Sequence, residues 1–177
     1  MSDWKVLSSE EVYRTPWIKV RRDKVLNHSG KPLTYSVVEL HHPTVFIVAA
    51  NSEAKILLQK SYRYTIDREM WELPAGHSEG QDYLEAARRE LLEETGLASD
   101  DWTHLGRFYQ AVGVANFPLE AYLARNVRET TKERDNLENI LEQKFVSFEE
   151  IESMALDGSF DNSTMLGLLY LAKLRGQ

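Results

Sequence analysis

The pattern of hydrophobic and polar residues changes after about residue 43. Before that point, short strand-like runs carry many charges, and two of them, Trp17–Leu26 and Leu33–Leu40, flank a turn cluster at 27–32. This arrangement predicts a β-hairpin. Because an isolated hairpin is only marginally stable in water, we expect it to pack on the rest of the chain or on a second subunit.

The part of the chain after residue 43 is more apolar. Thr44–Ala50 is a continuous apolar run, as expected for a strand buried on both faces. The mixture of strands and helices around it predicts a mixed sheet between helices. The other predicted strands are Lys55–Tyr62, the short extended segment 70–76, Trp102–Phe108, Leu119–Ala124 and 145–148. Two helices are predicted near the end, a short acidic one at Phe148–Met154 and a last one that begins near 161–163.

One further helix has clear start and stop signals. Asp82 is a good N-cap residue, and Glu85 three positions later predicts a capping box. Gly96 is a typical residue at a helix C-terminus, so the helix should run over Tyr83–Thr95. Its expected apolar stripe consists of Leu84, Ala87, Leu91 and Leu92.

Composition and charge narrow the function classes. The 177 residues are 42% hydrophobic and 28% charged, which is typical of a globular protein of about one domain. No apolar run approaches the roughly 20 residues of a membrane helix, and the first residues lack the apolar core of a signal peptide. The absence of cysteine excludes disulfides and thiolate chemistry and favours a reducing cytoplasm. The net charge of −7 argues against nucleic acid as the main partner, but not against a small phosphorylated ligand.

The candidate chemistry lies at the end of the predicted helix. Glu90 is three and four residues from Glu93 and Glu94, so these carboxylates are neighbours on the helix surface. Such like-charged pairs cost about 0.2–0.5 kcal/mol each, which divalent cations with oxygen ligands would offset. The alternative is a solvated helix face with pairs such as Glu85 to Arg89, which is the usual situation for a helix rich in Glu and Arg.

Several segments together resemble one enzyme family. Arg89–Leu97 reads Arg-Glu-Leu-Leu-Glu-Glu-Thr-Gly-Leu and resembles the second half of the Nudix box. Glu72–Gly76, Glu85–Arg88 and Tyr62–Tyr64 are similar to the ADP-ribose and nucleoside diphosphate sugar pyrophosphatase branch of that family. The resemblance covers nearly the whole chain and makes a functional role of the helix the better interpretation.

The resemblance implies a fold and a domain organisation. The expected class is α+β, a Nudix α/β/α sandwich with a mixed sheet, preceded by an N-terminal antiparallel β-hairpin region. Residues 1–43 would form this β region and 44–177 the Nudix hydrolase domain. In relatives of this branch the first region builds a dimer and the nucleoside pocket, so a homodimer is expected.

The resemblance also assigns the metal site. Glu90 and Glu94 would bind Mg²⁺ (or Mn²⁺), with Glu93 completing the set directly or through water. The carbonyl oxygen of Ala75, which precedes the box glycine, would be a further ligand. Arg89 would pair with a box carboxylate and hold it in place.

The remaining assignments lie outside the box. Arg63 would contact the phosphates of the substrate, and Glu72 would orient substrate or metal. The general base in the family usually lies on an acidic loop before a late strand, which gives Glu138 as the first candidate (base or additional metal ligand) and Glu142 as the second. The same stretch, 125–142, is rich in both charge signs and is equally consistent with a solvated loop.

Two departures from the family pattern bear on the site and the substrate. Counting back from Glu90, the box loop is one residue short, and Gln81 stands where the family has a glutamate. Val112 stands where ADP-ribose pyrophosphatases usually have a proline, which would fix the backbone of that loop. The second departure favours nucleoside diphosphate sugars in general, cleaved to nucleoside monophosphate and sugar phosphate. The alternatives are a dedicated ADP-ribose pyrophosphatase and a non-catalytic Nudix-like nucleotide sensor.

Overall fold

The computed structural model describes residues 3–130 and 140–176, and its α+β class agrees with the prediction. The chain forms two compact units. The first consists of Met1–Pro43 and Phe108–Leu119, and the second of Thr44–Arg107 and Glu120–Gln177. A short late segment of the chain therefore accompanies the N-terminal strands, which the sequence did not indicate.

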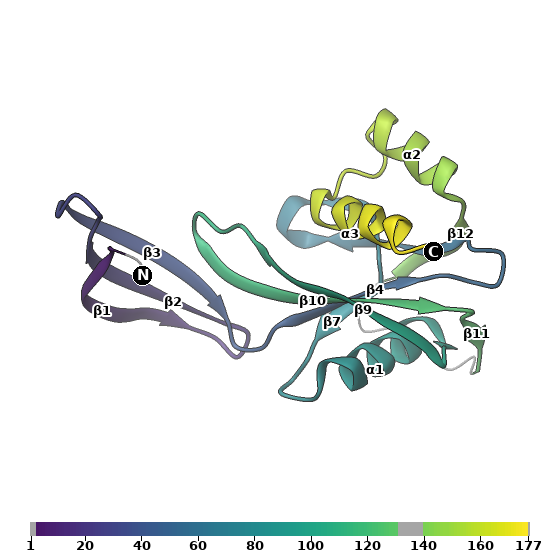
Figure 1. Cartoon of the computed structure of the whole chain (residues 1–177), viewed down its shortest axis with the longest axis horizontal. Helices are drawn as coiled ribbons and strands as arrows, with labels where there is room; N and C mark the ends of the chain where they lie inside the picture. Colours follow the sequence, from purple (N-terminus) through teal and green to yellow (C-terminus); the bar gives the residue numbers. More distant parts are fainter. Residues whose placement is uncertain (1–2, 131–139, 177) are drawn as a thin grey trace. The chain divides into compact units, whose positions relative to one another are not determined.

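The first unit is built on three antiparallel strands, β1 (Lys5–Arg14), β2 (Ile18–Leu26) and β3 (Pro32–Leu40) (Figure 1). The predicted hairpin is confirmed as β2 and β3, which pair from Ile18↔Leu40 to Leu26↔Pro32. The start of β10 (Ala115–Arg125) adds a short parallel pairing to β3. The sequence did not single out β1. Its register on β2 shifts twice, and such bulges interrupt the alternation by which a strand is recognised.

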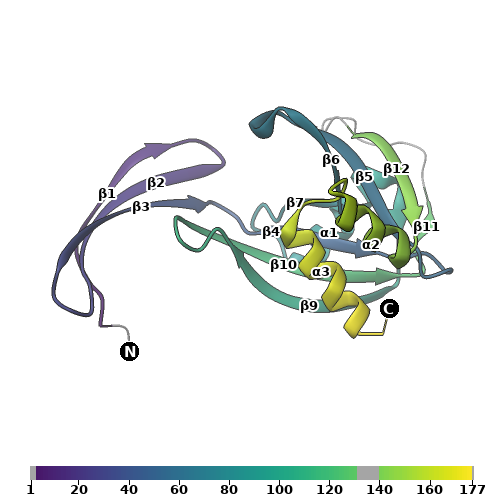
Figure 2. The same ribbon diagram turned by 90° about the horizontal axis from the view of Figure 1, so that it is seen from above.

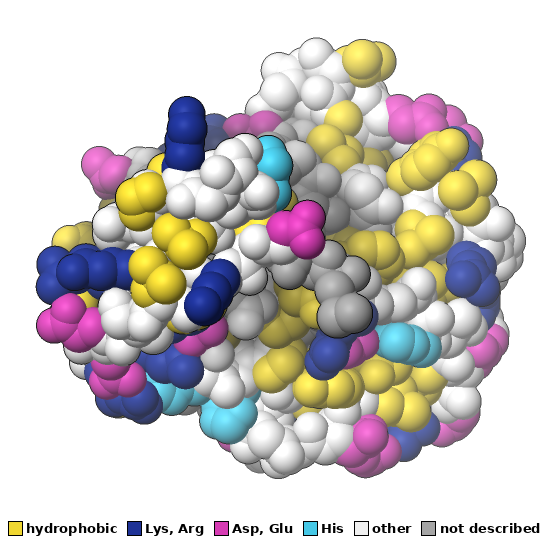
Figure 3. Space-filling model, turned by 60° about the vertical axis from the view of Figure 1, so that its left-hand side comes forward, with side chains coloured by type: hydrophobic (Ala, Val, Ile, Leu, Met, Phe, Trp, Pro, Cys, Tyr) yellow, Lys and Arg dark blue, Asp and Glu magenta, His cyan; other side chains and the backbone are white. Residues whose placement is uncertain are grey.

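The strands of the first unit bury few large side chains of their own. All ten residues of β1 are exposed, and the ion pairs Lys19–Glu39 (2.9 Å) and Arg22–Glu10 (2.7 Å) join neighbouring strands. Figure 3 shows hydrophobic side chains at the protein surface among Lys, Arg, Asp and Glu side chains. The large exposed hydrophobic residues of the N-terminal strands and their connections are Trp4, Val6, Leu7, Val12, Tyr13, Trp17, Leu33 and Tyr35.

The second unit contains the strands that position the candidate site. In its main sheet, β4 (Thr44–Ala49) lies between β10 and β7 (Ala75–His77), and β9 (Asp101–Gln110) pairs with β10. Because β10 pairs with β3 in parallel and β4 pairs with β7 antiparallel, the predicted mixed sheet is confirmed. The predicted segment 70–76 divides into two strands, because β6 (Arg68–Glu72) pairs with β5 (Ile56–Arg63), whereas β7 pairs with β4. The other strands of this unit, besides β5 and β6, are β8 (Leu97–Ala98), β11 (Arg128–Glu129) and β12 (Ile140–Val146). Strands β12, β5 and β6 form a small antiparallel sheet in that order, and β11 pairs with β8.

Helices cover both faces of β4 (Figures 1 and 2). Helix α1 (Tyr83–Thr95) lies on one face, and α3 (Ser163–Leu174) lies on the other. Helix α2 (Phe148–Asp157) precedes α3, and a 3₁₀ turn, η1 (Tyr64–Ile66), follows β5. This is the predicted sandwich. Among the residues that the structure describes, no helix combines the length and the apolar character needed to cross a membrane.

Helix α1 begins and ends where the sequence predicted. The Asp82 carboxylate accepts hydrogen bonds from the N–H groups of Leu84 and Glu85, and Gly96 takes the left-handed conformation at φ 71°. The predicted capping box was wrong in one half, because the Glu85 carboxylate instead accepts a hydrogen bond from Arg88. The N-cap itself is therefore supplied by Asp82.

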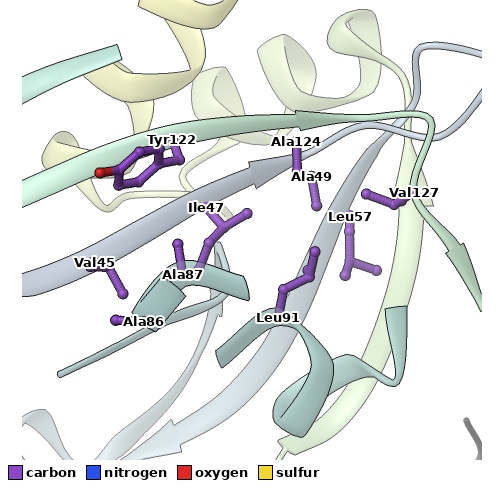
Figure 4. Close-up of a cluster of buried hydrophobic side chains, with 10 residues drawn as sticks. All are labelled: Val45, Ile47, Ala49, Leu57, Ala86, Ala87, Leu91, Tyr122, Ala124 and Val127. Carbon is purple, nitrogen blue, oxygen red and sulfur yellow. The ribbon is translucent and has the colours of Figure 1, made fainter. Parts of the chain in front are cut away.

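One buried hydrophobic cluster joins α1 to the sheet (Figure 4). Ala86, Ala87 and Leu91 have no exposed surface and pack toward β4. The predicted apolar stripe was wrong at Leu92, which is 40% exposed, while Glu90 and Glu94 are buried at 8% and 4% exposure. The helix thus buries two carboxylates where a purely structural helix would bury apolar side chains. The ten residues shown in Figure 4 are Val45, Ile47, Ala49, Leu57, Ala86, Ala87, Leu91, Tyr122, Ala124 and Val127.

Candidate functional site

A tight turn connects β7 to the start of the α1 segment. The N–H of Gln81 donates to the carbonyl of Ser78 at 2.8 Å, and the two residues between them have positive φ, 52° at Glu79 and 80° at Gly80. Positive φ at both central positions is the mark of a type I′ turn. This compact turn accommodates the loop that is one residue shorter than the family pattern.

Gly76 brings the Glu90 carboxylate against the backbone of β7. A Cβ atom at Gly76 would lie 2.0 Å from the Cδ of Glu90, so any other residue at this position would displace the carboxylate. Ala75, the residue before it, is held in β7 by pairing with Phe46 of β4. The sequence therefore requires glycine here because of close approach to a carboxylate, and Ala75 lies directly beside that contact.

Arg89 ties the turn to the helix. Its guanidinium donates to Glu90 Oε1 (2.8 Å), to Glu93 Oε2 (2.8 Å) and to the carbonyl of His77 (3.0 Å). Its Nε also donates to Oε1 of Gln81 at 3.3 Å. Burial lowers the pKa of Arg89, but the charges of Glu90 and Glu93 outweigh it and raise the pKa above the ordinary value. An amide oxygen at Gln81 thus accepts the bond at the position where the family has a glutamate oxygen.

Glu94 is held from a different direction and by a neutral group. The Nε2 of Gln59, in β5, donates to Glu94 Oε2 at 3.0 Å, and Gln59 is 1% exposed. The Nε2 of Gln143, in β12, lies 3.4 Å from Gln59 Oε1 and donates to the backbone carbonyl of Glu94 at 3.1 Å. Two strands of the small sheet therefore fix both the side chain and the main chain of Glu94.

A pocket of about 210 Å³ opens beside Gly76, the residue against which the Glu90 carboxylate lies. Arg63 Nε donates to Glu72 Oε2 at 2.7 Å, and Glu72 is 5% exposed and pairs across the strands with Gln59. The guanidinium and the buried carboxylates thus share one region of the second unit. The pocket is lined by Thr44, Phe46, Arg63, Glu72, Ala75, Gly76, His77, Asn162 and Met165.

The donor chemistry of this region fits a hard divalent cation. Glu72, Glu90 and Glu94 are all buried, and they accept hydrogen bonds from Arg63, Arg89 and Gln59 respectively. Oxygen ligands of this kind are those that Mg²⁺ and Mn²⁺ prefer. Within residues 3–130 and 140–176, no three Asp, Glu or His side chains lie close enough together in these conformations to hold a metal ion.

The other predicted site residues lie in several places. Glu93 is on the exposed side of α1, where its side chain pairs with Arg89. Glu142 is exposed and paired in register with Lys60, so it projects from the face of β12 opposite to Gln143. Val112 is 77% exposed in the turn between β9 and β10 of the first unit. Glu138 lies outside the described residues.

Gln59 and Gln143 were not predicted. They are polar positions in two strands separated by 84 residues, and neither belongs to a short motif. The one signal in the sequence is a glutamine between the apolar Ile56–Leu58 and Lys60, at a position that faces inward. A buried glutamine needs a partner, and the sequence alone did not identify Glu94 as that partner.

Comparison with known proteins identifies the domains and the fold. Residues 40–166 match the NUDIX domain, and residues 4–38 match the nucleoside diphosphate sugar hydrolase N-terminal domain. A solved structure described as an ADP compounds hydrolase superposes with a TM-score of 0.85 at 22% sequence identity, covering 98% of this chain and 95% of that one. That likeness concerns the fold.

Two curated relatives add sequence similarity. The ADP-ribose pyrophosphatase of Mycobacterium tuberculosis is 36% identical over 129 residues, which are 72% of this chain and 62% of that protein. The chain therefore spans less than two thirds of this relative. The methanol dehydrogenase activator of Bacillus methanolicus is 26% identical over 174 residues, or 94% of this chain and 91% of that protein. Because the NUDIX domain model matches 40–166, well over half of the sequence, the chain belongs to the Nudix family.

Proposed function

We propose that this protein hydrolyses the pyrophosphate bond of nucleoside diphosphate sugars, ADP-ribose among them, to a nucleoside monophosphate and a sugar phosphate. The observation that carries the proposal is the pair of buried carboxylates on α1, Glu90 and Glu94, because Glu90 lies against Gly76, which lines a pocket together with Arg63 and Glu72. Cleavage of a phosphoanhydride requires neutralised phosphate charge and a positioned water. This arrangement offers the groups for both requirements.

Glu90 and Glu94 would hold Mg²⁺ or Mn²⁺, with Glu93 and the Ala75 carbonyl as further ligands. A metal held there would supply neutralisation of phosphate charge and activation of water. Arg89 keeps Glu90 oriented from the side of the turn, and Gly76 leaves room for its carboxylate.

The remaining roles concern the substrate and the base. Arg63 is a donor for a phosphate oxygen, and Glu72 orients its guanidinium at 2.7 Å. Glu138 stays our first candidate for the general base. Glu142 stays the second, and it would have to act from a strand face opposite to that of Gln143.

We further propose a homodimer that acts on small nucleotides, rather than on nucleic acid, in the cytoplasm. The exposed aromatic and aliphatic residues of the N-terminal strands support self-association, because exposed apolar clusters of this kind usually mark interaction surfaces. The match of residues 4–38 to the N-terminal domain of nucleoside diphosphate sugar hydrolases supports a role of this region in binding the nucleoside. The net charge of −7 disfavours a polyanionic partner.

A panel of substrates tests the proposed reaction. ADP-ribose, other ADP-sugars, and UDP- and GDP-sugars are incubated with Mg²⁺, and the products are separated by anion-exchange chromatography. We expect a nucleoside monophosphate and a sugar phosphate from several of them. The absence of hydrolysis with all of them would contradict the proposal. A preference for ADP-ribose by orders of magnitude in kcat/KM would instead establish the dedicated ADP-ribose enzyme, which the mycobacterial relative favours and Val112 disfavours.

The relative named methanol dehydrogenase activator supports a second candidate, regulation of a partner protein. That function does not require turnover. A protein that binds sugar nucleotides but releases no nucleoside monophosphate in the panel would favour it.

A further inference from the structure

We propose that Gln59 is a positioning residue for Glu94, and that Gln143 holds Gln59 in the orientation this requires. The inference rests on the proposed function, because it assumes that Glu94 binds the metal. It adds a second support to the site, supplied by the small sheet β12-β5-β6 rather than by the box helix or its turn.

The contacts form a series of hydrogen bonds that leads from Gln143 through Gln59 to the Glu94 carboxylate. Gln143 Nε2 lies 3.4 Å from Gln59 Oε1, and Gln59 Nε2 donates to Glu94 Oε2 at 3.0 Å. Because Gln143 also donates to the Glu94 carbonyl at 3.1 Å, its Nε2 faces α1. The side-chain oxygen of Gln59 then faces Gln143, and its NH₂ group faces the carboxylate. The orientation of both amides is thus determined by the network.

The same contacts anchor the end of the helix. Glu94 is the penultimate residue of α1, so its carbonyl is among the last four that lack a partner within the helix. Gln143 supplies a donor to that carbonyl, while Gln59 fixes the carboxylate of the same residue. Main chain and side chain of Glu94 are therefore held by neighbouring strands, whose register places Gln143 opposite Gln59.

The two supports differ in chemistry. Glu90 accepts a hydrogen bond from a guanidinium, whereas Gln59 gives Glu94 a neutral amide donor. A neutral donor restricts the rotamer of a carboxylate and does not itself compete with a cation for the negative charge. Hydrogen bonds of this kind to metal ligands commonly affect metal affinity by about 10–100-fold when they are removed.

Gln59→Met tests the inference. Methionine keeps the length and approximate volume of glutamine but has no donor, so the fold should survive and the support of Glu94 should be lost. Mn²⁺ binding is measured by electron paramagnetic resonance on the protein without substrate, and kcat and KM are then measured against Mg²⁺ concentration. We expect the Kd for Mn²⁺ to rise about 10-fold or more. We also expect more Mg²⁺ to be needed for half-maximal activity, with a smaller change in the KM for the sugar nucleotide.

Leu58→Ala is the matched control. Leu58 is completely buried on the opposite face of the same strand, so this variant loses stability without touching Glu94. It should bind Mn²⁺ like the unchanged protein. Gln143→Leu should weaken Mn²⁺ binding less than Gln59→Met, because it acts one step further away.

An unchanged Kd for Mn²⁺ in folded Gln59→Met, or equal weakening in Leu58→Ala, would overturn the inference, as would absence of Mn²⁺ binding by the unchanged protein. Failure of the proposed function is distinguishable: the unchanged protein would then bind Mn²⁺ in a manner that depends on Gln59 and yet hydrolyse no sugar nucleotide.

Discussion

The two units of this protein obtain their stability in different ways. In the second unit, β4 buries five of its six residues, and α1 packs Ala86, Ala87 and Leu91 against it without exposed surface. In the first unit, every residue of β1 is exposed, and ion pairs such as Lys19–Glu39 connect the strands. The second unit therefore has a hydrophobic core of its own, whereas the first depends on strand pairing, charges and, in our proposal, a second subunit.

The two units therefore suit different roles, the second as a rigid scaffold for the carboxylates and the first as an exposed apolar surface. The site carboxylates Glu90 and Glu94 lie on a helix whose other inward positions belong to the core, which gives the rigid platform that precise ligand geometry requires. The first unit instead presents large apolar side chains, among them Tyr13 and Trp17, at the surface. Exposed apolar side chains of this kind usually mark interaction surfaces.

The largest contrast is expected for matched leucine truncations. Leu91→Ala, at a position with no exposed surface, should lower the free energy of unfolding by about 2–5 kcal/mol. Leu7→Ala, at 52% exposure on β1, should change it by less than about 0.5 kcal/mol in the monomer. Urea denaturation at low protein concentration measures both. Similar losses in the two variants would show that the first unit has a core of its own.

Self-association, unlike the free energy of unfolding, should depend on side chains of the first unit and not on those of the second. Tyr13→Asp places a charge among the exposed apolar residues of the first unit, so we expect at least about a 10-fold weaker dimer because a charge is costly to bury. Tyr170→Asp, at a 64% exposed position of α3, is the control and should leave the dimer intact. Sedimentation velocity over a concentration series distinguishes them, and a wild-type protein that is monomeric at micromolar concentration would refute the dimer.

The smallest expected effect is a pH dependence of the first unit. The hydrogen bond from Lys19 holds the pKa of Glu39 below its ordinary value, although burial opposes this. A carboxyl group with a depressed folded-state pKa stabilises the fold above its unfolded pKa, and this contribution is lost as the pH falls through the folded pKa. Glu39→Gln should therefore be less stable than wild type near neutral pH, by less than about 1 kcal/mol. The difference should disappear in acid. Melting curves across this pH range check the sign, and a difference that grows in acid would contradict it.

Much of the fold could be predicted because local signals agreed with tertiary packing. The apolar run that begins at Thr44 forms β4. Helix α1 starts after Asp82 and ends before Gly96, as predicted. Strand β1 was not singled out because it has two register shifts, after Val6 and after Glu11. These shifts interrupt the alternation of inward and outward residues by which a strand is recognised in a sequence. Leu92 was placed on the wrong face because Glu90 and Glu94 take inward positions that a hydrophobic pattern assigns to leucine.

The candidate site was predictable where its residues are close in sequence. Arg89 contacts Glu90 and Glu93 within two turns of one helix, and the resemblance had implied that Arg89 pairs with a box carboxylate. Gln59 and Gln143 act through pairing of distant strands, which depends on the whole fold and leaves no local pattern. The same limitation applies to Glu142, because a shift of one residue in strand register decides which face a side chain occupies.

The turnover of Glu94→Gln, compared with its melting temperature, tests the central claim most directly. Glutamine retains the size of the side chain and an oxygen that can accept the Gln59 hydrogen bond, but it removes the charge that would bind metal. We predict that kcat with Mg²⁺ falls by at least about 100-fold while the melting temperature changes by no more than a few degrees. Full activity, or a loss of activity that merely parallels a loss of thermal stability, would contradict the assignment of Glu94 to the metal site.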